Sequence, residues 1–336
     1  MRRKRLKIKG NRAVYHVMSR TVNGEHFFTD EDKGVFQRML PKVAAFCGVK
    51  ILTYCFMSNH FHLLVETPAM SPENLSDEEL IQRYQTLQED TQDMRESERA
   101  KRFAPLTTIQ VRNFLGNNNE EAENMRRSLI RRMHDISTFL QTLKQRMSIW
   151  YNSDRGRYGP LWADRFKSVL IESTKETLKV MAAYIDLNPV RAGLVEDPAD
   201  YPFCGYGEAC RKGRQRTAHL EEIVGIKDRL STDQEIVQEY RFLLLGQGLR
   251  DKEGKGKFTG AQEELRRMGL SAPPRIHLSA LFSRGEIIGS PLFVKRQIQN
   301  LGSNHPLKLK QWGNSSWASS KSFRSGQKGT KKKQNN

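Results

Sequence analysis

A strand-like run that carries two histidines one residue apart is the feature that most constrains how this chain folds. Residues 49–56 and 60–66 are rich in the β-branched and aromatic residues that strands favour. Side chains alternate between the two faces of a strand, so His60 and His62 share one face while Phe61 points to the other. Two imidazoles placed in this way suit a divalent metal ion. The alternative is a pair of surface histidines, or of buried ones with satisfied hydrogen bonds, so the motif alone does not decide the function.

The order of the elements around this run predicts the fold. Hydrophobic periodicity and helix-end signals place strands at 13–20, 49–56, 60–66 and 165–171, and helices at 31–46, 125–151 and 174–188. The resulting order β-α-β-β-α-β, with one further helix, is that of the ferredoxin-like or split βαβ fold. We therefore predict an α+β protein with an antiparallel sheet and helices on one face. The two histidines should lie on the other, free face.

The rest of the chain divides into additions to this domain. The expected parts are a basic arm at 1–12, the domain itself at 13–68 and 128–206, an insertion at 69–127, a C-terminal extension at 207–302 and a disordered basic tail at 303–336. The insertion is either helical or a disordered loop, and its acidic part is not expected to contact a polyanion, since residues 73–98 hold nine acids and two arginines. Helix-like segments in the extension are 232–246, 260–269 and 291–299.

The positive charge is concentrated at the two ends. The formal net charge is +18, residues 2–12 hold seven Lys or Arg and residues 306–336 hold eight, with no acid in either stretch. Basic arms of this kind favour a polyanionic partner such as nucleic acid. The alternative is a pair of solvated tails that only keep the protein soluble. The chain has no apolar run long enough to cross a membrane and no secretion signal, and its four cysteines lack zinc-ligand spacing. We expect a cytoplasmic protein, associated with the nucleoid.

A tyrosine and an asparagine in the last predicted helix supply further chemistry. Tyr184 and Asn188 are four residues apart and project from the same helix face, and Pro189 places them at its last turn. A tyrosine there is a candidate nucleophile, and an amide oxygen is a hard ligand that would complete a site begun by His60 and His62. The alternative for Tyr184 alone is a half-buried structural aromatic.

Several segments, in this order and spacing, resemble a known family. They are residues 15–20, 60–62, 159–168 and 184–195, followed by 200–206. Together they resemble the single-tyrosine HUH transposases, and more closely the REP-associated tyrosine transposases related to the IS200-like group. The resemblance covers somewhat under half of the chain.

The resemblance implies a reaction and a set of site residues. It implies that Tyr184 is the catalytic nucleophile, and that His60, His62 and Asn188 bind Mg²⁺ or Mn²⁺. The implied reaction is the metal-dependent cleavage and rejoining of single-stranded DNA at hairpins of repetitive palindromes, through a 5′-phosphotyrosine. The candidate DNA-binding residues are Arg20, Asn23, Arg165 and Lys167. Related enzymes differ in whether the tyrosine acts within one subunit or across a dimer, so a monomer and a homodimer both stay open.

Three other functions compete with this interpretation. The first is a domesticated protein that binds DNA hairpins without cutting them. The second is a metal-dependent hydrolase, which would want further ligands, whereas the other histidines, His16 among them, show no metal spacing in the sequence. The third is an RNA-binding domain with the same sheet topology, which would display aromatic residues where this chain has histidines.

Overall fold

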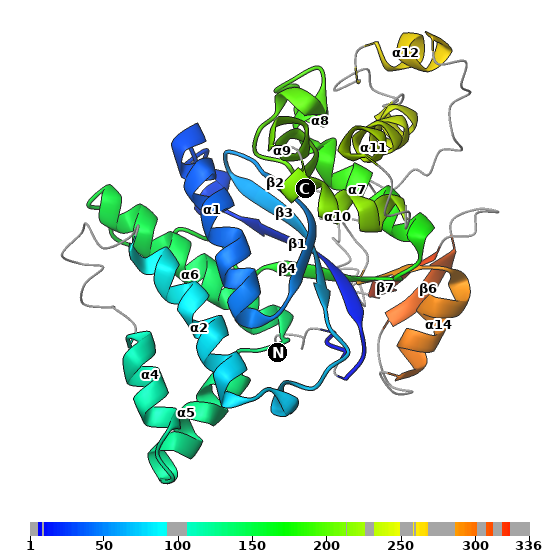
Figure 1. The fold of residues 1–336 in the computed structure, drawn as a ribbon. Helices are drawn as coiled ribbons and strands as arrows, with labels where there is room; N and C mark the ends of the chain where they lie inside the picture. The colour runs from blue at the N-terminus through cyan, green and yellow to red at the C-terminus, as the bar shows by residue number, and fades with distance from the viewer. Residues whose placement is uncertain are drawn as a thin grey trace, which may run out of the picture.

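Four antiparallel strands form the centre of the protein, in the order β2-β3-β1-β4. They are β1 (Ala13–Arg20), β2 (Lys50–Phe56), β3 (His60–Thr67) and β4 (Lys167–Ile171). With helices between β1 and β2 and between β3 and β4, this arrangement confirms the predicted ferredoxin-like core (Figure 1). The computed structural model describes residues 6–8, 10–92, 106–212, 214–225, 232–248, 258, 260–267, 286–300, 307–311 and 318–322.

One face of the sheet is covered as predicted, by α1 (Asp30–Cys47) and α6 (Ile136–Asp154). The ring of Phe61 packs against Phe36 and Trp162, with centroid distances of 5.1 and 5.4 Å. Helix α1 begins at Thr29, whose side chain caps its first turn, and ends at Gly48, where φ is 62°. A side chain at position 48 would be strained by that φ, so the glycine fixes the end of the helix.

A polar turn divides the helix that the sequence predicts over 125–151. The structure has α5 (Glu120–Ile130), a turn with His134 at a φ of 54°, and then α6. The side chain of Asp135 accepts hydrogen bonds from the N–H groups of Ser137 and Thr138, at 2.7 and 3.0 Å. Because this cap starts a new helix, the prediction of one continuous helix was wrong.

The insertion is helical, so the disordered alternative does not hold for its described residues. Its elements are η2 (Pro72–Asn74), α2 (Asp77–Gln92), α4 (Thr108–Leu115) and α5. Helix α2 packs on α1 through the buried side chains of Leu80, Tyr84 and Leu87. Its acidic side chains pair within the insertion, Asp77 with Arg126 and Glu78 with Arg112. The insertion therefore enlarges the helical layer on the α1 face (Figure 1).

The second face of the sheet, which the sequence analysis expected to be free, is covered as well. Figure 1 shows the covering helices on the opposite side of the strands from α1 and α6. They are α7 (Lys175–Asp186), α9 (Gly205–Lys212), α10 (Arg214–Val224) and, packed on α7, α11 (Asp233–Gly248). The expectation was wrong because α7, the further helix that the sequence predicts, packs on β2 and β3, and α9 and α10 add to this cover; no sequence pattern indicated the tertiary position of these helices.

The extension also lengthens the sheet to seven strands, in the order β2-β3-β1-β4-β5-β7-β6. Its further elements are η3 (Pro198–Asp200), α12 (Ala261–Arg267), β5 (Ile287–Gly289), α14 (Pro291–Asn300), β6 (Leu307–Gln311) and β7 (Ala318–Ser322). Strand β5 is parallel to β4, so the whole sheet is mixed rather than antiparallel. The expectation of a disordered tail is wrong for β6 and β7, and the remainder of 303–336 lies outside the described residues.

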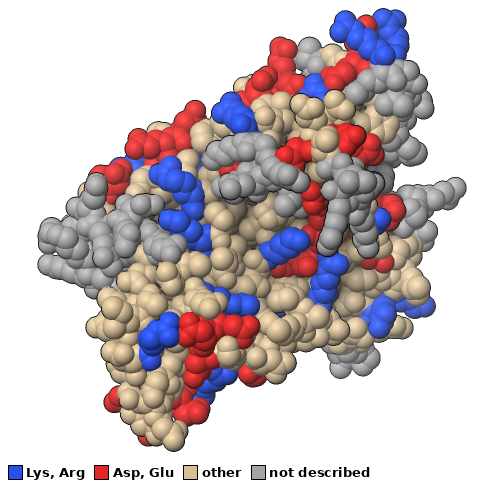
Figure 2. Space-filling view, in the orientation of Figure 1, with Lys and Arg blue, Asp and Glu red and all other residues tan. Residues whose placement is uncertain are grey.

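Charge on the described surface is mixed in sign. Figure 2 shows basic and acidic side chains interspersed over the face in view. This agrees with the sequence, in which the two ends of the chain carry most of the excess positive charge.

Candidate active site

The sheet brings three histidines to the face that α7 covers. In the antiparallel register, His62 of β3 lies opposite Met18 of β1, and Leu64 lies opposite His16. Paired residues point to the same face, so His16, His60 and His62 all face α7. The exposed fraction of both His16 and His62 is only 4%, whereas His60 is half-buried. No role is predicted for His16 from the sequence, although the alternation of β1 places His16 and Met18 on one face.

The hydrogen bond of His60 determines which of its nitrogens is available. Its Nδ1 lies 2.6 Å from Oδ1 of Asn59. An amide oxygen only accepts, so Nδ1 of His60 carries the proton and donates. Nε2 of His60 is then the nitrogen with a lone pair for a ligand.

The Nδ1 atom of His62 is in contact with His16, as the Nδ1 atom of His60 is with Asn59. Nδ1 of His62 lies 2.9 Å from Nε2 of His16. The two ring planes are within 12° of parallel and the centroids are 5.1 Å apart, so the rings are nearly coplanar and the two nitrogens face each other. Nε2 of His62 lies on the other side of its ring.

Burial keeps these imidazoles neutral. It lowers the pKa of His16 and, together with the charges of Arg20 and His26, that of His60 to about 4. Burial, followed by the neighbouring His16, holds the pKa of His62 well below its usual value. At neutral pH the rings are therefore in the form that binds metal ions.

Helix α7 places Tyr184 against two of these histidines. The helix begins at Thr174, whose side chain accepts a hydrogen bond from the N–H of Thr177. The half-buried ring of Tyr184 stands edge-on to His16 and His62, with centroid distances of 5.9 and 6.1 Å. The structure thus brings together the predicted nucleophile and the histidine pair, which lie far apart in the sequence.

Arg191 is a second residue that the sequence analysis left without a role. It lies in α8 (Asn188–Arg191), its guanidinium is 4.4 Å from the ring centroid of Tyr184, and its Nη1 donates to the Tyr184 carbonyl at 2.7 Å. Burial raises the pKa of Tyr184, and the charge of Arg191 opposes that rise. Arg191 therefore favours the phenolate that a nucleophilic tyrosine requires.

Asn188 folds back onto the end of α7. Its Nδ2 donates to the carbonyls of Tyr184 and Ile185, both at 3.0 Å. The amide nitrogen thereby satisfies helix-end carbonyls, and the amide oxygen is the atom suited to a metal ion.

These donors fit the divalent ion that the sequence predicts. No group of three His, Cys, Asp or Glu side chains able to hold a metal ion occurs within the described ranges. A site begun by His60 and His62 would therefore need a third protein ligand of another residue type, and the amide oxygen of Asn188 is the candidate that the sequence offers. The hydrogen bond on Nδ1 of each histidine is the usual support of a ligating imidazole.

A buried carboxylate ties α7 to the extension. Asp186 is fully buried and accepts hydrogen bonds from Tyr240 of α11 at 2.6 Å and from Thr53 of β2 at 2.9 Å. It also accepts one from the N–H of Tyr206 at 3.1 Å. Burial raises the pKa of Asp186 to about 6, against the effect of these hydrogen bonds. The helix of Tyr184 is thus held both by β2 of the ferredoxin-like core and by α11 of the extension.

The four predicted DNA-binding residues are all exposed. Arg20 lies opposite His60 in the β1–β3 pairing. Lys167 lies opposite Met18, which in turn lies opposite His62, so Lys167 belongs to the same cross-strand row as that histidine. Arg165 precedes β4, and Asn23 has a φ of 54° in the short turn η1 (Val22–Gly24). Arg20 and Lys167 are therefore on the histidine face.

Part of the basic N-terminal arm is paired within the protein. Lys7 binds Asp135 at 2.7 Å, and Arg12 binds Glu66 and Glu222 at 2.5 and 2.7 Å. These two positive charges hold the arm on the fold and are partly neutralised there. The residues before Leu6 lie outside the described part of the chain.

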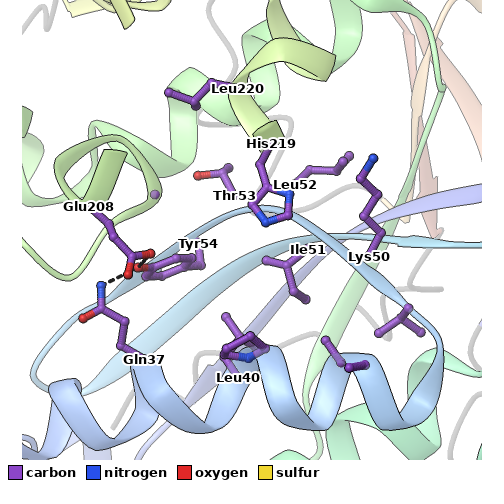
Figure 3. Close-up of a pocket in the computed structure, with 15 residues that line it drawn as sticks. Gln37, Leu40, Lys50, Ile51, Leu52, Thr53, Tyr54, Glu208, His219 and Leu220 are labelled. Atoms are coloured by element: carbon purple, nitrogen blue, oxygen red, sulfur yellow. Dashed lines mark hydrogen bonds between the residues drawn. The ribbon is translucent and has the colours of Figure 1, made fainter. Parts of the chain in front are cut away.

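A cavity of about 260 Å³ at the outer edge of β2 is separate from this site (Figure 3). Its walls are mostly apolar side chains of α1, β2 and α10. At one end, the hydroxyl of Tyr54 is hydrogen bonded to Gln37 and Glu208. None of the histidines of the α7 face lines it, so the cavity is not the candidate active site.

In this protein, the sheet face that carries the HxH strand is packed against a helix with a half-buried tyrosine. Residues 10–97 match the model of a family described as "Transposase IS200 like". This range contains β1 and β3, and hence all three histidines of the site, but it ends before α7. The resemblance expected from the sequence is confirmed over these residues.

One solved structure is also similar, described as "Structure of the REP associates tyrosine transposase bound to a REP hairpin". The identity is 15%, the TM-score is 0.37, and the likeness covers 63% of this chain and 87% of that chain. No curated protein matches. Within the described ranges, no helix is both long and apolar enough to cross a membrane.

Proposed function

We propose that this protein is a transposase with endonuclease activity that cleaves and rejoins single-stranded DNA at hairpins of repetitive palindromes, with Tyr184 as the nucleophile. The observation that carries the proposal is the placement of the Tyr184 ring against His16 and His62 on the covered face of the sheet. The family match over 10–97 supports the same class of reaction. Mg²⁺ or Mn²⁺ held by His60, His62 and Asn188 would polarise the scissile phosphate and neutralise developing charge.

The protein's own groups account for the strand exchange. Oη of Tyr184 loses its proton and attacks phosphorus, a Tyr–O–P bond forms, and the bond from phosphorus to the 3′ oxygen breaks. The leaving oxygen takes up a proton and becomes a free 3′-hydroxyl, while the 5′-phosphate stays on Tyr184. A 3′-hydroxyl that attacks this phosphotyrosine expels the tyrosine and rejoins DNA, so recombination consumes no ATP. Arg191 assists the first step because its charge favours the phenolate.

Exposed cations on the histidine face suit the phosphates on either side of the scissile bond. Arg20 beside His60, and Lys167 in the row of His62, are the two candidates that the sheet places there. Arg165 and Asn23 would contact DNA farther from the bond that breaks. Cover of the sheet face by α7 argues against the RNA-binding alternative, since that mode needs an open face.

Formation of a covalent adduct tests the proposal directly. Purified protein is incubated with single-stranded hairpin oligonucleotides from palindromic repeats near its gene, with Mn²⁺ or with EDTA, and run on denaturing gels. We expect a metal-dependent protein–DNA adduct that Tyr184→Phe abolishes while hairpin binding stays within a few-fold.

The matched control is Tyr151→Phe, because Tyr151 lies on the α1 face and its hydroxyl donates to the Phe27 carbonyl at 3.4 Å, away from the three histidines. Undiminished cleavage by Tyr184→Phe would remove Tyr184 as the nucleophile. Tight hairpin binding by the wild type without any adduct would favour the alternative, a domesticated protein that binds hairpins without cutting them.

A further inference from the structure

We propose that His16 is a positioning residue, which accepts a hydrogen bond from Nδ1 of His62 and so presents Nε2 of His62 to the metal ion. The inference rests on the metal site of the proposed function, and it adds a residue that lies in a different strand from the HxH pair. His16 touches both sides of that site, since its ring also lies against Tyr184.

The geometry is that of a hydrogen bond rather than of two ligands of one ion. Nε2 of His16 and Nδ1 of His62 are 2.9 Å apart and face each other across nearly coplanar rings. Two imidazoles that bind one ion instead direct both nitrogens at a third point. His16 therefore supports a ligand and does not occupy a coordination position through Nε2.

The direction of the hydrogen bond follows from the chemistry of a ligand. A neutral imidazole carries one proton, and the nitrogen without it is the one that binds metal. If His62 donates from Nδ1, its Nε2 is bare. If His62 instead accepted from His16, its Nε2 would hold the proton and could not bind an ion. His16 thus has the same effect on His62 that Asn59 has on His60.

Burial of the two rings favours a single tautomer of His62. Both rings have an exposed fraction of 4%, so bulk water has little access with which to replace the hydrogen bond between them. A partner that fixes the tautomer and orientation of a ligating histidine is typically worth a factor of about 10–100 in metal affinity.

Mn²⁺ binding to the DNA-free protein, followed by electron paramagnetic resonance, tests the role without any cleavage assay. We expect His16→Phe, which keeps a ring but cannot accept, to raise the Kd for Mn²⁺ about 10–100-fold. His16→Gln, whose amide oxygen can accept from Nδ1 of His62, should stay within a few-fold of the wild type. The control His134→Gln should change nothing, because His134 lies in the α5–α6 turn beside Met70 and Arg83.

Two outcomes of the Mn²⁺ binding experiment would overturn the assignment: unchanged Mn²⁺ affinity in His16→Phe, or a loss in His16→Gln as large as in His16→Phe. Melting curves check that each variant folds, and His16→Leu replaces the phenylalanine variant if that ring is too large. Nitrogen NMR of the wild-type protein with labelled histidine tests the proposal without any substitution. We expect the proton of the His62 ring on Nδ1. A proton on Nε2 contradicts the proposal.

The outcome of the Mn²⁺ binding experiment can be distinguished from the outcome of the adduct assay that tests the proposed function. If Mn²⁺ binding follows this pattern but no hairpin yields an adduct, the transposase proposal fails and the positioning role of His16 stands. If the adduct forms but substitutions at position 16 leave the Mn²⁺ affinity unchanged, the transposase proposal stands and the positioning role of His16 fails.

Discussion

Asn188 and Arg191, which lie around Tyr184, each make more than one contact. A suitable substitution removes one of these contacts and keeps the other. Asn188 donates from Nδ2 to the end of α7, and its amide oxygen is the proposed ligand. Arg191 both stacks on the Tyr184 ring and donates to its carbonyl. Substitutions that keep one contact and remove the other therefore report on each function.

Asn188→Ala should raise the Mn²⁺ concentration needed for half-maximal adduct formation by at least about tenfold. Loss of a residue that supports a metal ligand typically lowers metal affinity by about 10–100-fold, and loss of a ligand itself should lower it at least as much. Asn188→Asp keeps an oxygen ligand but loses the donor to the Tyr184 and Ile185 carbonyls, so it should need far less metal than the alanine variant. The measurement is adduct yield against Mn²⁺ concentration. Equal loss of activity in the alanine variant at saturating and limiting Mn²⁺ would count against ligation by Asn188.

Arg191→Met should move the rising limb of the pH–rate profile for adduct formation to higher pH. The charge of Arg191 lowers the pKa of Tyr184 against the rise caused by burial, so its removal leaves less phenolate at any given pH. Arg191→Lys keeps a positive charge and should shift the profile less. A methionine variant with an unshifted profile would show that Arg191 has no influence on ionisation.

At the scale of elements, a cap decides where α6 begins and links it to the N-terminal arm. Asp135 caps the helix and also binds Lys7. Burial tends to raise the pKa of Asp135, but the hydrogen bonds from Lys7 and from the helix N–H groups outweigh it, and the net pKa is below the usual 3.8. The ionised cap therefore stabilises the fold above that value, and this contribution is lost as the pH falls through the lower folded pKa.

Asp135→Ala should lower the free energy of unfolding by about 1 kcal/mol at pH 7. The difference from the wild type should shrink as the pH falls below about 4, where the carboxylate of the unfolded chain becomes protonated, and should vanish once the folded protein is protonated as well. Asp135→Asn retains a good cap and loses only the charge, so it should cost a few tenths of a kcal/mol. Urea denaturation at several pH values measures all three proteins. A cost that stays constant down to pH 2 would contradict the ionised cap.

At the scale of the whole molecule, the C-terminal extension and the helix of Tyr184 behave as one packed unit. Asp186 of α7 joins Tyr240 of α11, and Arg241, the next residue of α11, binds Asp197 and Glu264 at 2.8 and 2.5 Å. The extension therefore supports α7 and also covers part of the sheet.

Tyr240→Phe should lower the free energy of unfolding by about 1.5–3 kcal/mol, since it removes a hydrogen bond to a buried carboxyl group. Tyr158→Phe is the matched control, because Tyr158 is 77% exposed and its change should stay within about 0.5 kcal/mol. Denaturant unfolding measures both variants. A Tyr240→Phe protein as stable as the control would mean that the extension does not hold α7 through Asp186.

Local patterns in the sequence were enough to predict the ferredoxin-like core and the shared face of His60 and His62. Strand alternation is a short-range property of the backbone, and it holds wherever the strand packs. The four-residue spacing of Tyr184 and Asn188 predicted that both lie in one helix, whereas α7 ends at Asp186 and Asn188 begins α8. The cap at Asp135 was also visible in the sequence, but the apolar periodicity that continues across it favoured a single helix.

Only the tertiary structure decided what surrounds those residues. The contact of His16 with His62 depends on the β1–β3 register, and the cover over the sheet depends on where the extension folds back. Both join residues far apart in the chain, and the free energy of such contacts comes from packing and burial that no local pattern specifies. The sequence by itself therefore determined the candidate chemistry, and long-range packing determined which side chains support it.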